Sequence, residues 1–304
     1  MRRRFFSNNK ISVIKYLSTD LSIVIPYNMP SFGKKIKSNT YSDLGVIEFY
    51  GILTLIGDQA FTSCTSLSSI TIPESVTEIG HAAFSGCTSM ASVTIPDSVT
   101  TIGYAAFDGC SSLTSVTIPD NVTSIGDNAF NECSSLTEFI GKFASNDGRC
   151  LIVDGTLHSF APAGLIEYEI PEGVTTIRGM AFDECSSLIS VTIPNSVTTI
   201  GNNAFAGAYG LTSFTIPEGV TSIGKSAFCC CVNLESLTIP EGVISIGYGA
   251  FGGCSSLKSL TIPSSVETIG NQMFSNCENL TGITWNGTVY TSPEDFEAAF
   301  NATE

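Results

Sequence analysis

Phenylalanine recurs every 23 residues along most of this chain. The interval is kept by Phe61, Phe84, Phe107 and Phe130, and again by Phe182, Phe205, Phe228, Phe251 and Phe274. Proline keeps the same interval at Pro73, Pro96, Pro119, Pro171, Pro194, Pro217, Pro240 and Pro263. A fixed period of this length is typical of a solenoid, in which each repeat forms one coil that packs only on its neighbours. The sequence therefore predicts a repeat solenoid of about ten coils.

The repeat at residues 110–130 shows how one coil is expected to fold. Apolar Leu113, Val116 and Ile118 are interleaved with polar Ser115 and Thr117. This alternation predicts a short strand with one buried face, which Pro119 ends because it has no N–H to donate. A second short extended stretch is expected over residues 122–125. Gly126 is then expected to free the backbone at a corner, and residues 127–130 to form a short helical turn.

Each coil alone would leave its apolar side exposed, so the coils are expected to stack. Stacking in register gives two parallel ladders, a longer one from the strands before proline and a shorter one from the stretches before glycine. The predicted class is thus an α/β-type solenoid dominated by short parallel β-strands. Its core would hold aligned columns of Phe, Leu, Ile and Cys.

Most of the eleven cysteines share one position of the repeat. These are Cys64, Cys87, Cys110, Cys133, Cys185, Cys231, Cys254 and Cys277, with Ala208 in the same position of one coil. Side chains stacked in this way point in parallel rather than toward each other, which disfavours disulfides. The pattern predicts a ladder of reduced, buried thiols that behave as small hydrophobic groups.

Charge and hydropathy exclude several classes of function. The formal net charge of −15 argues against a nucleic-acid partner, because phosphate binding needs a basic surface. No apolar run is long enough to span a bilayer, so membrane insertion is not expected. Arg2, Arg3 and Arg4 resemble the basic start of a secretion signal, but no apolar segment follows, so a classical signal peptide is not expected. Unconventional export, a leader outside this sequence and an intracellular location all fit this pattern.

The period breaks between Phe130 and Phe182, where residues 139–170 form an irregular stretch. Apolar runs at residues 150–153 and 156–160 flank Asp154-Gly155, and Asp-Gly between such runs is a strong hairpin signal. A β-hairpin that projects from the solenoid or folds along it is one interpretation. A coil of different geometry that changes the curvature is the other.

Both ends of the chain lack the repeat and are predicted to be caps, since open solenoid ends need covering. In the N-terminal segment, residues 1–45, strands are expected at residues 11–16 and 21–25, followed by a linker through Asn39. The C-terminal cap is expected at residues 286–304, where Ser292 and Pro293 mark a helix start. The solenoid itself is expected to span residues 46–285.

The repeat resembles the BspA-type leucine-rich repeat, whose unit reads roughly Leu-x-x-Ile-x-Ile-Pro-x-x-Val-x-x-Ile-Gly-x-x-Ala-Phe-x-x-Cys. The resemblance covers about residues 46–285. It implies a curved, right-handed leucine-rich-repeat rod that is commonly secreted or exposed on the cell surface and binds proteins or cells. It implies no catalytic residues.

Two exposed columns are candidate contact surfaces. The hydroxyl-lined strand face is formed by Ser92, Thr94, Ser115, Thr117, Ser190, Thr192, Ser213, Thr215, Ser236, Thr238, Ser259 and Thr261. Such a face suits a glycan or a polar protein surface, although Thr is also an ordinary strand residue. The acidic column after each proline is formed by Glu74, Asp97, Asp120, Glu172, Glu218 and Glu241. It suits a basic partner or divalent cations, or it simply keeps exposed turns soluble.

Catalytic and metal chemistry have little support in the sequence. The only histidines are His81 and His158, and neither recurs with a nucleophile and a carboxylate. The run 229–231 is all cysteine, but Cys231 belongs to the core ladder and the Cys-x-x-Cys pairs typical of zinc sites are absent. We therefore expect no enzyme activity, no metal site and no cofactor.

The favoured interpretation is a non-enzymatic interaction or adhesion module. Its extended polar surface would contact a protein or glycan on a host or neighbouring cell. The alternative is a structural spacer without a specific ligand.

Overall fold

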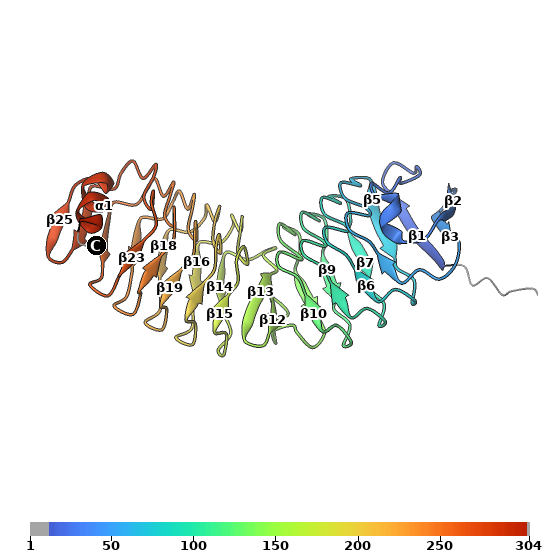
Figure 1. Ribbon diagram of the computed structural model, residues 1–304, viewed down its shortest axis with the longest axis horizontal. Helices are drawn as coiled ribbons and strands as arrows, with labels where there is room; N and C mark the ends of the chain where they lie inside the picture. The colour runs from blue at the N-terminus through green and yellow to red at the C-terminus, as the bar shows by residue number, and fades with distance from the viewer. Residues whose placement is uncertain (1–11, 303–304) are drawn as a thin grey trace, which may run out of the picture. The chain divides into compact units, whose positions relative to one another are not determined.

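The computed structural model describes residues 12–302, so the arginine cluster at residues 2–4 and the start of the predicted first strand at Ile11 lie outside the described residues. The chain divides into two compact units, an N-terminal unit that ends at Lys142 and a C-terminal unit that begins at Phe143. Each unit is a solenoid of stacked coils with parallel strands (Figure 1). The division falls inside the irregular stretch at residues 139–170.

Each coil contributes one strand to a longer ladder, which we call the strand face. In the N-terminal unit it contains β5 (Leu67–Thr71), β7 (Ser92–Thr94), β9 (Ser115–Thr117) and β11 (Glu138–Ile140). In the C-terminal unit it contains β14 (Glu167–Glu169), β16 (Ser190–Thr192), β18 (Ser213–Thr215), β20 (Ser236–Thr238), β22 (Ser259–Ile262) and β24 (Gly282–Trp285). Pairing is parallel and joins residues 23 positions apart, such as Ser213 and Ser236. The predicted long ladder is confirmed.

A second ladder runs along each unit at the shorter strands that precede glycine. In the N-terminal unit it contains β4 (Leu55–Ile56), β6 (Glu78–Ile79), β8 (Thr101–Ile102) and β10 (Ser124–Ile125). In the C-terminal unit it contains β15 (Thr176–Ile177), β17 (Thr199–Ile200), β19 (Ser222–Ile223), β21 (Ser245–Ile246) and β23 (Thr268–Ile269). Two longer strands, β12 (Cys150–Val153) and β13 (Thr156–Phe160), extend the same sheet beyond β15. This second ladder is confirmed as well.

The third side of the coil is not helical, contrary to the prediction for residues 127–130. Asn128 has a φ of 59°, and Ala82 and Ala105 have φ values of 50° and 51° at the same position. Alternate N–H groups of this segment point toward the next coil, so Ala82 donates to the carbonyl of Tyr104 at 2.8 Å. An α-helical turn would instead keep its hydrogen bonds inside the coil. The turns therefore form a third hydrogen-bonded side.

Gly126 is required for a different reason from the predicted one. Its φ is not positive, but a Cβ at this position would lie 2.3 Å from the backbone nitrogen of Tyr104 in the preceding coil. At Gly103 the added Cβ would lie 2.6 Å from the carbonyl carbon of Gly80. The glycine column thus permits the close approach of neighbouring coils.

The phenylalanine side chains form the stacked columns that the period predicts. Phe107 lies between Phe84 and Phe130, with ring centroids 5.2 and 5.3 Å away. In the C-terminal unit Phe228 lies between Phe205 and Phe251, at 5.3 and 5.7 Å. Fully buried aromatic rings of this size contribute strongly to the stability of each coil.

The cysteine ladder is reduced and mostly buried, as predicted. In the regular coils each thiol also donates a hydrogen bond to a phenylalanine carbonyl 26 residues earlier. These pairs include Cys87 with Phe61, Cys110 with Phe84, Cys231 with Phe205 and Cys254 with Phe228, at 3.1 to 3.3 Å. Burial raises the pKa of Cys231 to about 12 and that of Cys277 to about 11. The column is therefore uncharged at neutral pH.

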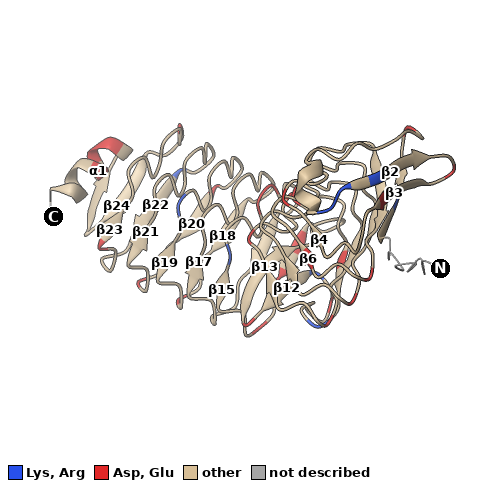
Figure 2. Ribbon diagram, turned by 45° about the vertical axis from the view of Figure 1, so that its right-hand side comes forward, with Lys and Arg blue, Asp and Glu red and all other residues tan. Residues whose placement is uncertain are grey.

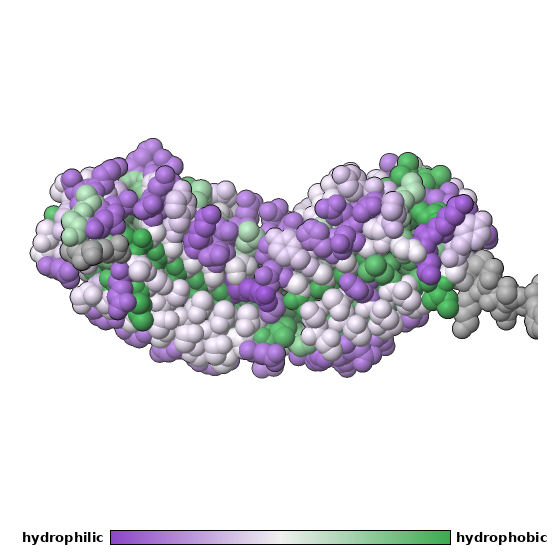
Figure 3. All heavy atoms as spheres, viewed as in Figure 1, coloured by the Kyte–Doolittle hydropathy of each residue, from purple (hydrophilic) through white to green (hydrophobic). Residues whose placement is uncertain are grey.

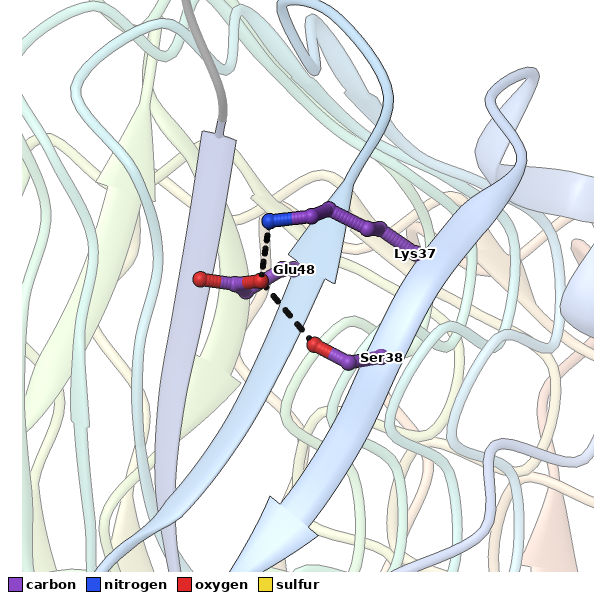
Figure 4. Close-up of polar contacts among 3 residues, drawn as sticks. All are labelled: Lys37, Ser38 and Glu48. Atoms are coloured by element: carbon purple, nitrogen blue, oxygen red, sulfur yellow. Dashed lines mark hydrogen bonds and ion pairs between the residues drawn. The ribbon is translucent and has the colours of Figure 1, made fainter.

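The N-terminal cap is an antiparallel sheet, and it differs in part from the prediction. It contains β1 (Ser12–Ser18), the 3₁₀ helix η1 (Met29–Phe32), β2 (Ile36–Tyr41) and β3 (Gly45–Phe49). The strand β1 pairs antiparallel with β5 and so covers the first coil. The expected linker through Asn39 instead contains most of β2, which Lys37 and Ser38 tie to Glu48 of β3 at 2.8 and 3.0 Å (Figure 4).

The strand expected at residues 21–25 is absent. Only Val24 of this run is buried, and its N–H and carbonyl bond to the side chains of Tyr16 and Asn39 rather than to a strand. The side chains of Leu21 and Ile25 are 76% and 67% exposed. Hydrophobic residues gather on the surface of the N-terminal unit near its cap in Figure 3.

A hairpin is present where one of the two interpretations placed it, and a helix begins at the residues that the sequence indicated. Asp154 and Gly155 have φ values of 48° and 74°, as in the turn of a tight hairpin between β12 and β13. Because β13 also pairs in parallel with β15, the hairpin folds along the C-terminal unit and covers the first edge of its second ladder. At the other end follow β25 (Thr288–Tyr290) and α1 (Pro293–Asn301), where Ser292 caps α1 by accepting from the N–H of Asp295 at 3.1 Å. Phe296 and Phe300 of α1 are buried.

Candidate interaction surface

The strand face presents hydroxyl side chains in register. In each regular coil an apolar residue, which is half-buried at Val93 and buried in the others, lies between a Ser and a Thr that point outward, because successive side chains of a strand alternate in direction. In the C-terminal unit Ser213 pairs with Ser236, and Ser236 pairs with Ser259. In the N-terminal unit Thr71 pairs with Thr94. The repeat period thus places like hydroxyls beside each other from coil to coil.

All twelve predicted surface residues lie on the strand face. Ten are exposed, namely Ser92, Thr94, Thr117, Thr192, Ser213, Thr215, Ser236, Thr238, Ser259 and Thr261, and two are half-buried, namely Ser115 and Ser190. None of these side chains forms a hydrogen bond with any of the residues that the structure describes. Their hydroxyl groups are therefore available to solvent or to a partner.

Hydroxyl groups beside the second ladder are used differently. Thr100 donates to the carbonyl of Thr77 at 3.2 Å, and Thr198 donates to that of Thr175 at the same distance. Ser98 donates to the carbonyl of Val76 at 2.6 Å. These hydroxyls link each coil to the one before it. Both faces are therefore rich in Ser and Thr, but only the hydroxyls beside the second ladder hold neighbouring coils together.

Four of the predicted residues meet around one hollow in the C-terminal unit. Ser190, Thr192, Ser213 and Thr215 line a shallow depression of about 320 Å³, together with Asn195 and the neighbouring apolar residues. The hydrogen-bonded ladder is interrupted here, since β16 and β18 belong to different sheets.

Phe214 of β18 is one of the apolar residues that line this hollow. It occupies the position that Val191 holds in β16, and its larger ring packs between Phe205 and Phe228 at 4.9 and 4.7 Å. The ladder is interrupted in the same way between β7 and β9, which carry Val93 and Val116, so the ring alone does not explain the interruption.

The strand face also contains several residues outside the predicted set. Ser69, Thr71 and Thr284 continue the hydroxyl columns. Glu138 pairs with Ser115 at the end of the N-terminal unit, whereas Glu167 and Glu169 pair with Ser190 and Thr192 at the start of the C-terminal unit. Each of them lies 23 residues before or after one of the predicted residues, so the repeat period alone was enough to predict its position.

The acidic column follows the turns after the strand face. Glu74, Asp97, Asp120, Glu172, Glu218 and Glu241 are all exposed, one in each of their coils. Figure 2 shows acidic residues spread along both units, with few lysines and arginines among them. Within residues 12–302 no group of three or more His, Cys, Asp or Glu side chains is placed to hold a metal ion.

The two histidines lie in different environments. The ring of His81 stacks on that of Tyr104, with centroids 5.2 Å apart. His158 is 8% exposed and contacts the guanidinium of Arg178 at 3.1 Å. Both are explained by local packing within the N-terminal and the C-terminal unit, respectively.

In the cysteine run, Cys231 is buried in the core ladder as predicted. Cys229 is half-buried and Cys230 is exposed, so these two thiols lie outside the core. Among the helices of residues 12–302, none is both apolar enough and long enough to span a bilayer.

The family model described as "BspA type Leucine rich repeat region" matches residues 54–146 and 157–281, in 6 copies. The two matched segments leave out residues 147–156, where β12 and the turn of the hairpin lie. Among curated proteins no match was found.

Solved structures of bacterial leucine-rich-repeat proteins are similar. A leucine rich cell surface protein from Faecalibacterium prausnitzii is 31% identical, with a TM-score of 0.58 over 81% of this chain and 79% of that chain. A leucine-rich repeat protein from Eubacterium ventriosum is 26% identical, with a TM-score of 0.57 over 77% of each chain. The pneumococcal vaccine antigen PcpA is 21% identical, with a TM-score of 0.60 over 80% of this chain and 75% of that chain, and so supports the fold alone. The chain belongs to the BspA-type leucine-rich-repeat family.

Proposed function

We propose that this protein is a non-enzymatic interaction module that binds a protein or glycan through the strand face. The observation that carries the proposal is the contrast between the two sets of hydroxyls. Those beside the second ladder bond to the preceding coil, whereas those on the strand face bond to no described residue. Exposed hydroxyls can donate and accept, so in-register columns of them suit a polar partner that lies across several coils.

The hollow between β16 and β18 is the centre of the proposed surface in the C-terminal unit. It offers hydroxyls from both strands and the amide of Asn195 around a concave site. Concave sites with convergent polar groups favour specific contacts over a flat face. The flanking columns of β20 and β22 would extend the contact, so that binding is distributed over several coils.

The partner is expected on a host or neighbouring cell, which requires that the protein be displayed outside its own cell. The similar Faecalibacterium prausnitzii protein is described as a cell surface protein. Fractionation of native cells that express a tagged chain tests this part of the proposal. Recovery at the surface or in the medium supports it, and recovery in the cytosol contradicts it.

A panel of immobilised glycans and extracellular proteins tests the binding face. The face variant combines Ser213→Ala, Thr215→Val, Ser236→Ala and Thr238→Val, and the matched control combines Thr198→Val and Thr221→Val beside the second ladder. We expect the face variant to lose binding and the control to keep it, with each single substitution weakening binding only a few-fold, by about 0.5–1.5 kcal/mol. One single substitution that abolishes binding would contradict the distributed surface.

Deletion of two whole coils, residues 213–258, separates this proposal from a structural spacer. The deletion removes β18 and β20 and joins coils of the same register. A spacer keeps its function when it is shortened in this way. An interaction module loses its partner, while circular dichroism still reports a folded solenoid.

A further inference from the structure

We propose that Cys229 and Cys230 form a redox-active vicinal dithiol, which peroxide or a low-molecular-weight disulfide closes to a reversible disulfide on the surface of the C-terminal unit. The two sulfur atoms are 3.4 Å apart. Cys230 is exposed and Cys229 is half-buried, whereas eight of the other nine cysteines are buried. This modification is separate from the strand face and from the proposed binding function.

The core does not require sulfur at either position. The position of Cys229 is held in other coils by residues as different as Ser85, Asp108, Asn131, Ala206, Gly252 and Ser275. The position of Cys230 has a positive φ in every coil, and Gly86, Gly109, Gly207 and Gly253 occupy it elsewhere. Cys230 adopts this left-handed conformation, with a φ of 61°, although glycine adopts it at lower cost. Packing therefore gives no reason for two thiols here.

The coils on either side leave Cys230 open to reagents. Its counterparts in the preceding and following coils are Gly207 and Gly253, which carry no side chain. A Cβ at Gly253 would lie 3.3 Å from the sulfur of Cys230, so the sulfur occupies the space over this glycine. Because Cys230 is exposed, a small oxidant can reach its sulfur from solvent.

The backbone around the pair is held by the neighbouring coils. The N–H of Cys230 donates to the carbonyl of Gly252 at 2.7 Å, and the N–H of Gly207 donates to the carbonyl of Cys229 at 2.8 Å. Closure therefore relies on side-chain rotation within a fixed turn, and the resulting small ring is strained. Strained and exposed disulfides are reduced more easily than structural ones, so the bond is reversible.

The chemistry balances with either oxidant. With hydrogen peroxide, the sulfur of Cys230 attacks one oxygen, giving a sulfenic acid and one water. The sulfur of Cys229 then displaces the hydroxyl from Cys230, forming the S–S bond and a second water. With a low-molecular-weight disulfide, the same bond forms and two thiols are released. Burial and the neighbouring Cys230 raise the pKa of Cys229 to about 11, which suits Cys230 as the first nucleophile and Cys229 as the resolving thiol.

Mass spectrometry of the native full-length chain tests the proposal with two probes, hydrogen peroxide and oxidised glutathione. After oxidation, accessible thiols are blocked with a maleimide and the chain is cleaved after lysine, which yields the segment between Lys225 and Lys258. We expect the mass of this segment to fall by two hydrogen atoms. We also expect two fewer of its thiols to react with the maleimide. Dithiothreitol should restore both.

Three variants assign the bond. Cys229→Ser and Cys230→Ser should each abolish the loss of two hydrogens, because no partner thiol remains. Cys231→Ala should retain it, because Cys231 lies in the core and donates to the carbonyl of Phe205. If Cys231→Ala does not fold, fragmentation of the wild-type segment locates the bond instead.

Three other outcomes would overturn the proposal. These outcomes are the coupling of two chains through Cys230, a stable glutathione adduct or sulfinic acid at Cys230, and two thiols that both remain alkylatable. Each result would show that the pair does not close within one chain.

Discussion

The two units repeat one motif with different fidelity. In the N-terminal unit the glycine position is filled by Gly57, Gly80, Gly103 and Gly126, and the cysteine position by Cys64, Cys87, Cys110 and Cys133. In the C-terminal unit Arg178 occupies one glycine position, and Ala208 occupies one cysteine position. The hollow beside β18 and the Cys229–Cys230 pair also lie in the C-terminal unit.

This difference separates what builds the fold from what distinguishes one coil from the next. The phenylalanine columns continue through both units with similar spacing, so the exceptions do not break the core. A surface of identical coils offers a partner no unique place. The departures in the C-terminal unit supply such places at positions where the core tolerates them.

Matched phenylalanine substitutions test whether the two cores are equivalent and should have the largest effect. Phe107→Ala and Phe228→Ala each remove a fully buried ring that stacks on two others. We expect each to lower the free energy of unfolding by about 3–5 kcal/mol, because a buried cavity remains. Urea unfolding measures both. A much smaller loss for Phe228→Ala would show that the less regular unit is also the looser one.

Substitution at the glycine position should cost more stability in the N-terminal unit than in the C-terminal unit. Gly103→Ala places a Cβ 2.6 Å from the backbone of Gly80, so we expect a loss of about 1–3 kcal/mol. Arg178 already carries a side chain there, because the preceding strand is β13 of the hairpin rather than a regular coil. Arg178→Ala removes its contact with His158 and should cost no more than about 1 kcal/mol. Equal losses, measured by thermal unfolding, would mean that crowding between coils does not explain the glycine column.

The period predicted the parts of the fold that depend on repetition. In-register stacking followed from it, because identical coils bury their apolar sides best when like residues align. The hairpin and the start of α1 carried strong local signals, Asp154-Gly155 and Ser292-Pro293. Positive φ values at alternate turn residues such as Ala105 were not predictable, since a left-handed alanine is stabilised only by the bonds to the next coil.

The N-terminal cap shows the limit of local patterns. The apolar run at residues 21–25 suggested a strand, but its backbone bonds to the side chains of Tyr16 and Asn39. Contacts between distant residues decided the conformation of this run. In the candidate site, the period placed the hydroxyls but not the hollow between β16 and β18, because identical coils give no reason for a depression at one of them.

The loss of stability at alkaline pH should report the burial of the thiol of Cys231 in the C-terminal unit. Burial raises the pKa of Cys231 to about 12, above the ordinary value of about 8.5. Its stabilising contribution is therefore full below about pH 8.5 and is lost as the pH rises toward 12, because the unfolded thiol releases its proton first. Above about pH 8.5 each such thiol lowers stability by about 1.4 kcal/mol per pH unit. Because Cys231→Ala lacks this thiol, its free energy of unfolding should fall less steeply with pH, by about 1.4 kcal/mol per pH unit between about pH 8.5 and 10.5. Urea unfolding at several pH values measures this slope, and a slope equal to that of the wild type would contradict the assignment.

Ala208→Cys would restore the repeat in the C-terminal unit and should have the smallest effect. Ala208 is 1% exposed, and in regular coils a cysteine at this position donates to a phenylalanine carbonyl 26 residues earlier, which here is that of Phe182. Because thiols are weak donors, we expect a gain of about 0.5 kcal/mol in the free energy of unfolding. The nearby Gly210 indicates the opposing effect, since a Cβ there would lie 2.5 Å from the carbonyl oxygen of Leu188, so this coil lies close against the one before it. Ala208→Ser, which offers a smaller donor to the same carbonyl, is the matched control. If Ala208→Cys destabilises the protein while Ala208→Ser does not, the neighbouring residues pack too closely around Ala208 to accept a larger side chain. Alanine is then required by the packing of this coil.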